Sequence, residues 1–203
     1  MRIRASILTN VNLKTHRACR RICTLERGLV NWIASGKRVA VVGVGNEMRR
    51  DDAVGVQVAR KLRGKLSRRF RLIEAGTIPE SYIDKVREFK PTHVLIIDAA
   101  QLGTNPGNST LLSPRKVKGL SISTHTLPLN VFAEFVKRET GSKVKILAIQ
   151  PKDLEFGEGM TDELTRTAED LTAILLRVDG SLAPKRRARK FAESHKREEN
   201  IFN

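Results

Sequence analysis

The stretch VAVVGVGNEMRRDDAVGVQVARKL, residues 39–62, predicts how this chain folds. Its first six residues are apolar, with four valines, as expected for a buried strand, and a glycine-rich polar turn follows. From residue 53 to residue 66 the apolar positions recur at helical spacing. A strand, a tight turn and a helix in this order form the repeating unit of α/β proteins.

The same alternation continues along the chain. Further strands are predicted at 71–75, 93–98 and 144–149, with 109–113 as one more candidate, and further helices at 80–89, 128–140 and 161–177. The strands are apolar on both faces, which is typical of a sheet covered by helices on each side. We therefore predict an α/β fold, a three-layer α/β/α sandwich around a mostly parallel central sheet.

The positive charge of the chain is concentrated at its two ends. The 203 residues carry a formal net charge of +16. Residues 1–38 carry +8 and residues 181–203 carry +4, so residues 39–180 carry only +4. This distribution does not favour a nucleic acid as the main partner of the central part.

Composition also sets the expected organisation and location. We predict a basic N-terminal extension at 1–35 with a short helix at 25–35, one domain at 36–180 and a basic C-terminal tail at 181–203. The apolar runs are shorter than the roughly 20 residues of a membrane span, and polar residues interrupt the basic N-terminal stretch. We therefore expect a cytoplasmic protein with neither a membrane segment nor a signal peptide.

The glycine-rich turn resembles a dinucleotide-binding loop only in part. Met48 stands where the third glycine of G-x-G-x-x-G would be, and Glu74 lies 31 positions after Gly43 instead of about 20. Asp51 and Asp52 would repel a phosphate at the start of the helix. A nucleotide-binding regulatory module remains the alternative function.

Three polar residues follow the predicted strands on the same side of the sheet. Asp52 follows the first strand, Asp98 ends HVLIID at 93–98, and His125 precedes the helix predicted at 128–140. Ligands of open α/β sheets bind beyond the carboxyl ends of the strands, so these residues are expected to share one site. Two carboxylates and an imidazole can bind a divalent first-row metal ion. Each residue alone also has a structural interpretation, such as Asp51 or Asp52 capping the following helix.

Four motifs carry a family resemblance. GVGNEMRRDDAVG, LIIDAAQLG, STHTLPL and AIQPKDLEFGEGMT occur in this order. They resemble the nickel–iron hydrogenase maturation endopeptidases over about residues 36–178, in particular the branch that serves hydrogenase 3 of formate hydrogenlyase. The resemblance implies the phosphorylase/hydrolase-like form of the three-layer fold.

The resemblance also implies roles for individual residues. Asp52, Asp98 and His125 match the catalytic, metal-contacting positions of the family. Asp51 matches an acidic position beside them, where we expect a helix cap or a supporting group. The glycine-rich turn matches the segment that shapes the cleft, with its three supporting residues Gly43, Gly45 and Asn46.

The activity that this resemblance implies is a single proteolytic cut. The substrate and partner would be the hydrogenase large-subunit precursor, which loses a short C-terminal extension after nickel has been inserted. Nickel would then arrive with the precursor, and we expect no permanent cofactor. We further expect a monomer.

Overall fold

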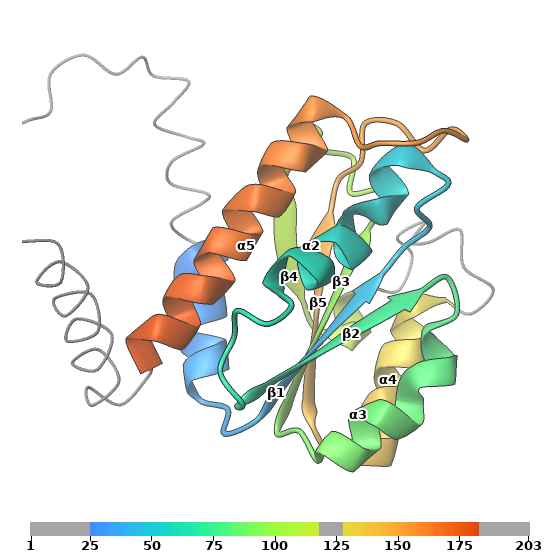
Figure 1. Ribbon diagram of the computed structural model, residues 1–203. Helices are drawn as coiled ribbons and strands as arrows, with labels where there is room; N and C mark the ends of the chain where they lie inside the picture. Colours follow the sequence, from blue (N-terminus) through green and yellow to red (C-terminus); the bar gives the residue numbers. More distant parts are fainter. Residues whose placement is uncertain (1–24, 118–127, 183–203) are drawn as a thin grey trace, which may run out of the picture.

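The computed structural model describes residues 25–117 and 128–182, and it has a central sheet with helices on both faces (Figure 1). The strands are β1 (Val39–Val44), β2 (Phe70–Gly76), β3 (His93–Ala99), β4 (Ser109–Leu112) and β5 (Lys143–Ile149). The helices are residues 25–34, α2 (Val54–Leu62), α3 (Ile83–Phe89), α4 (Leu129–Thr140) and α5 (Asp162–Leu182). Short 3₁₀ turns are η1 (Arg50–Ala53), η2 (Pro79–Tyr82) and η3 (Pro114–Val117). The predicted three-layer α/β fold is confirmed.

The sheet is mostly parallel, as predicted. Its strand order is β2-β1-β3-β5-β4. Strands β1, β2, β3 and β5 pair in parallel, and β4 pairs antiparallel with β5 at the edge of the sheet. The carboxyl ends of the four parallel strands therefore meet at one edge, which we call the carboxyl edge.

Alternation along the strands builds two apolar cores. In β1, Val39 and Val41 belong to the core beneath α2 and α5, whereas Ala40 and Val42 belong to the core beneath α3 and α4. Successive side chains of a strand point to opposite faces of the sheet, so an unbroken apolar run fills both cores at once.

Two helices end at different residues from those predicted. The helix predicted at 53–66 corresponds to α2, which ends at Leu62 instead of continuing to residue 66. Arg63 has an extended ψ of 127° and Gly64 has a φ of +74°, so the backbone leaves the helical conformation there. The last helix, α5, continues to Leu182 instead of ending at 177. None of the described helices combines the length and apolarity that crossing a bilayer requires.

The predicted helix at 25–35 is confirmed and is packed into the domain. Leu29 and Ile33 are fully buried in the core beneath α2 and α5. The Arg69 guanidinium donates a hydrogen bond of 2.7 Å to the Ile33 carbonyl at the end of this helix. The helix is therefore attached to the sheet by apolar burial and by a charge-assisted hydrogen bond.

Acidification is expected to destabilise the protein through His93, at the start of β3. His93 is buried, with its ring nitrogens 3.0 Å from Ser35 Oγ and 3.1 Å from Thr92 Oγ1. Burial, with the nearby charges of Lys143 and Arg69, lowers the pKa of His93 below its ordinary value of 6.5. The unfolded chain therefore binds a proton at this imidazole more readily than the folded chain does. The contribution of neutral His93 to the free energy of unfolding is thus complete above about pH 6.5 and is lost as the pH falls.

The measurement is urea unfolding at pH 7.5 and pH 5.5. We expect the free energy of unfolding to be lower at pH 5.5, and His93→Gln to reduce this difference. An equal pH difference in the two proteins would show that other groups cause it.

Candidate active site

The turn after β1 is built around close backbone contact with η1. Gly45 has a φ of +143°, and a Cβ atom there would lie 1.8 Å from the Asp52 carbonyl oxygen. Asn46 Oδ1 accepts a 2.9 Å hydrogen bond from the Met48 backbone N–H, which closes a local turn. The Asn46 backbone N–H donates in turn to Asp52 Oδ2 at 3.2 Å. These contacts fix the position of η1 against the end of β1.

A pair of glycines allows α2 to lie directly on the sheet. A Cβ atom on Gly43 would lie 2.2 Å from the Gly55 carbonyl oxygen. A Cβ atom on Gly55 would lie 2.1 Å from the Ile97 carbonyl oxygen and 2.3 Å from that of Val44. Gly43 therefore shapes the site indirectly, because it sets how closely α2 and η1 approach the strands.

Asp52 and Asp98 both lie at the carboxyl edge. Asp52 is in η1, which follows the turn after β1, and is only 2% exposed. Asp98 is the next-to-last residue of β3 and is fully buried. In the register of β1 with β3, Gly43 pairs with Ile97, and η1 contacts β3. The structure thus brings the segments of the two predicted carboxylates together.

Asp51 does not cap the helix. The starts of η1 and α2 have no side-chain cap hydrogen bond. Instead the buried Asp51 carboxylate accepts hydrogen bonds from the backbone N–H groups of three residues in the loop after β5: Lys152 (2.8 Å), Asp153 (2.9 Å) and Thr161 (2.7 Å). The Thr161 hydroxyl adds a further hydrogen bond of 3.1 Å. The backbone N–H groups of this loop need an acceptor, and the buried Asp51 carboxylate supplies it.

No pattern in the sequence indicates this arrangement. Asp51 and Asp52 are adjacent and chemically identical, but one bonds the loop after β5 and the other accepts from the turn after β1. Three of the four donors to Asp51 are backbone N–H groups, which almost every residue has.

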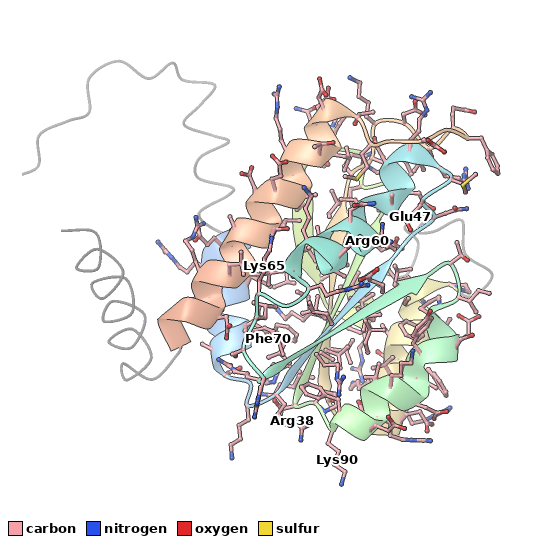
Figure 2. The ribbon with its side chains drawn as sticks, in the orientation of Figure 1. Arg38, Glu47, Arg60, Lys65, Phe70 and Lys90 are labelled. Atoms are coloured by element: carbon pink, nitrogen blue, oxygen red, sulfur yellow. The ribbon has the colours of Figure 1, made fainter. Side chains whose placement is uncertain are left out.

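Two other acidic side chains near this edge, Glu47 and Glu74, are paired with arginines in the last turn of α2 or just after it. Glu47 accepts hydrogen bonds of 2.6 and 2.9 Å from Arg60, and Figure 2 shows the two side chains beside each other. The hydrogen bonds from Arg60, followed by its charge and a hydrogen bond from Gln57, lower the pKa of the Glu47 carboxyl, although partial burial opposes the shift. Glu74, at the end of β2, forms ion pairs with Arg60 and Arg63.

The third predicted site residue, His125, lies outside the described residues. Within residues 25–117 and 128–182, no group of three or more His, Cys, Asp or Glu side chains is placed to bind a metal ion. Of the three predicted site residues, the described part of the chain contains Asp52 and Asp98. The neighbouring helix α4 begins at Leu129 and packs on the face of the sheet to which Val94 and Ile96 belong. By alternation along β3, this is also the face of Asp98.

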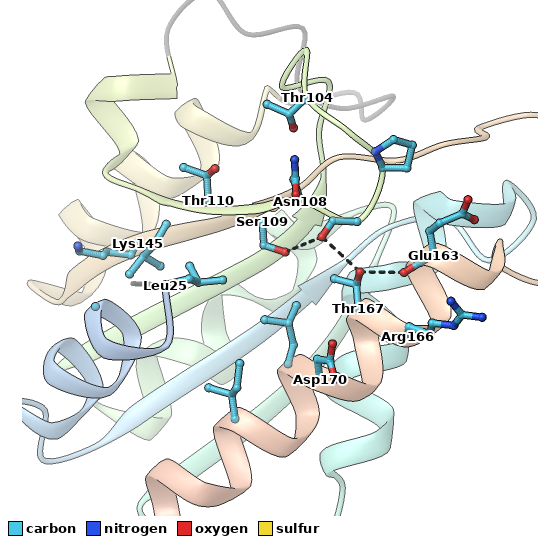
Figure 3. A pocket seen from close by; sticks show the side chains of 16 residues that line it. Leu25, Thr104, Asn108, Ser109, Thr110, Lys145, Glu163, Arg166, Thr167 and Asp170 are labelled. Carbon is cyan, nitrogen blue, oxygen red and sulfur yellow. Dashed lines mark hydrogen bonds between the residues drawn. The ribbon is translucent and has the colours of Figure 1, made fainter. Parts of the chain in front are cut away.

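A cavity of about 920 Å³ lies away from these residues, between the helix at 25–34, β4 and α5 (Figure 3). Leu25, Leu111, Lys145, Arg166, Asp170 and Ile174 are among its lining residues. None of the predicted site residues lines it. Sequence patterns did not predict this cavity, because it forms where three segments distant in the chain meet.

Comparisons with known proteins agree with the resemblance seen in the motifs. The family model described as "Hydrogenase maturation protease" matches residues 56–178. The hydrogenase 3 maturation protease of Escherichia coli K12 is 34% identical over 127 residues, which cover 62% of this chain and 81% of that protein. A relative from Methanocaldococcus jannaschii, also named as a hydrogenase maturation protease, is 32% identical over 162 residues, covering 76% and 95%.

The solved structures agree as well. The crystal structure of a [NiFe] hydrogenase maturation protease from Thermococcus kodakarensis has a TM-score of 0.69 and 32% identity, covering 74% of this chain and 97% of that one. The crystal structure of the hydrogenase 3 maturation protease has a TM-score of 0.61 and 31% identity, covering 72% and 92%. Sequence and fold thus lead to one conclusion: this chain belongs to the family of hydrogenase maturation proteases.

Proposed function

We propose that this protease removes a short C-terminal extension from the nickel-loaded large-subunit precursor of a nickel–iron hydrogenase, in the cytoplasm and as a monomer. One observation carries the proposal. The buried carboxylates Asp52 and Asp98 lie at the carboxyl edge, on segments that contact each other, in a chain of this protease family. Buried carboxylates at such an edge are candidates for catalytic or ligand-binding groups.

The proposed chemistry is hydrolysis of one peptide bond. Water adds its oxygen to the carbonyl carbon, the C–N bond breaks, and the leaving nitrogen takes a proton. Asp52 and Asp98 would contact nickel that the precursor brings, and His125 would be the third group. Nickel is then part of the substrate and the protein needs no permanent cofactor. A metal ion in this position can polarise the carbonyl, and a carboxylate can accept the proton of the water.

The alternative of a nucleotide-binding module gains no support from the turn. The Asn46 backbone N–H, which a phosphate would need, donates to Asp52 Oδ2. Glu74, at the end of β2 where a ribose-binding acid would stand, is paired with Arg60 and Arg63. The backbone N–H and the acidic side chain that a dinucleotide would need are therefore already bonded to other groups of the protein.

The proposal is tested by incubating the purified protein with nickel-loaded and nickel-free precursor and weighing the products by mass spectrometry. We expect one shortened product, formed only from the nickel-loaded precursor, and none with His125→Ala. Equal cleavage of both precursors would contradict the role of nickel. No cleavage of either precursor by the folded wild-type protein would overturn the proposed substrate.

A further inference from the structure

Large exposed apolar side chains gather at the carboxyl edge. Among the described residues they are Met48, Ile78, Val131 and Phe156, with exposed fractions of 58%, 52%, 46% and 77%. Met48 follows β1, Ile78 follows β2, Phe156 follows β5, and Val131 lies in the first turn of α4. Apolar side chains exposed together beside a site often mark a contact surface.

Met48 and Phe156 lie on two segments that are bonded to each other. The Gly157 N–H donates to the Met48 carbonyl at 3.0 Å, and the Arg50 N–H donates to the Gly157 carbonyl at 3.1 Å. Arg49 and Gly157 thereby form an isolated parallel bridge. Phe156 precedes Gly157 and Met48 precedes Arg49, so both apolar residues sit beside this bridge.

Asp51 holds the same loop from the inside. Its carboxylate bonds the loop at Lys152 and Asp153, before Phe156, and at Thr161, after it. The Asp51 N–H also donates to the Asp153 carbonyl at 3.2 Å, and Arg49 Nε donates to the Leu154 carbonyl at 3.1 Å. The loop is thus fixed at both of its ends to the turn that carries Asp52.

We propose that Asp51 is a positioning residue that holds Phe156 and Met48 as an apolar contact for the protein substrate beside Asp52. This inference rests on the proposed function, and the occupant is the apolar surface of the precursor next to its cleavage site. A protein surface fits these side chains because they are exposed to solvent, and because the backbone of the loop that carries Phe156 is already held in place, so that less conformational entropy is lost when a partner covers it.

The first experiment measures KM and kcat for precursor cleavage by Phe156→Ser. We expect KM to rise by about tenfold, as for a central apolar contact of an interface, while kcat changes less than twofold. Phe156→Leu, which keeps the apolar surface, is expected to retain the wild-type KM. The control is Lys65→Ser, an exposed change beyond the end of α2, at the opposite edge of the sheet (Figure 2).

The second experiment tests whether Asp51 acts through the loop. An amide in place of this carboxylate would turn an N–H group toward backbone donors, so Asp51→Asn should raise KM. In the Phe156→Ser background the same change should raise KM no further. Thr161→Val, which removes only the hydroxyl donor, should give a smaller rise and serves if Asp51→Asn fails to fold.

The possible outcomes separate this inference from the proposed function. If the wild type cleaves the precursor and Phe156→Ser has an unchanged KM, the apolar contact is wrong although the proposed function stands. If Asp51→Asn raises KM equally in the wild-type and the Phe156→Ser backgrounds, the positioning role is wrong. If Asp51→Asn fails to fold, the same comparison is made with Thr161→Val. If the wild type cleaves no precursor, the proposed function itself fails.

Discussion

Asp98→Asn is expected to lower kcat for precursor cleavage by roughly 10²- to 10⁴-fold, the range lost when a positioned acid or base is removed. The amide has nearly the same size as the carboxylate, so the packing around this fully buried side chain changes little. It has no negative charge to offer a metal ion and cannot accept a proton from water. Asp52→Asn should have an effect of the same order.

The measurement is single-turnover cleavage of nickel-loaded precursor, with thermal unfolding of each variant as the check on folding. Asp84→Asn is the matched control, because Asp84 is an exposed carboxylate on α3 whose partner is Arg87, at 2.6 Å. It should cleave at the wild-type rate. If folded Asp98→Asn retains more than a tenth of the wild-type kcat, Asp98 is not a catalytic residue.

Gly55→Ala is expected to reduce the free energy of unfolding by about 3 kcal/mol or more, at the upper end of what overpacking a core causes. The new Cβ atom would lie 2.1 Å from the Ile97 carbonyl oxygen and 2.3 Å from that of Val44. Both oxygens belong to strands, so relief requires α2 to move away from the sheet. Urea unfolding followed by circular dichroism measures the loss.

Gly28→Ala is the matched control for this prediction. Gly28 lies in the helix at 25–34, and a Cβ atom there would have no neighbour within 4 Å. Alanine favours a helix over glycine by up to about 1 kcal/mol, so this variant should be as stable as the wild type or more stable. Equal stability of the two variants would show that α2 does not need its close approach to the sheet.

The strands were predictable because their sequence signal is local. Each parallel strand is a short run in which apolar residues predominate, and the observed ends of β1, β2, β3 and β5 agree with the predicted ones within one residue. The end of α2 was not predictable with the same accuracy. The residues after Leu62 continue a helical pattern in the sequence, but the backbone leaves the helix at Arg63 and Gly64.

The candidate site was predictable to the extent that topology determines it. Asp52 and Asp98 each follow or end a parallel strand, and such ends meet at one edge of a sheet. The role of Asp51 was not predictable in this way, because its hydrogen-bond partners lie about one hundred residues away in sequence. The exposure of Phe156 was not predictable either, since it depends on how the loop after β5 packs against the turn after β1, which no local pattern encodes.

The burial of the helix at 25–34 has a practical consequence for anyone who trims the gene. The motifs begin only at Gly43, and a shortened protein starting at residue 36 would keep all of them. Such a product would lack Leu29 and Ile33, which are fully buried, and would expose part of the apolar core beneath α2 and α5 to water. Expression tags and cleavage sites therefore belong upstream of Leu25.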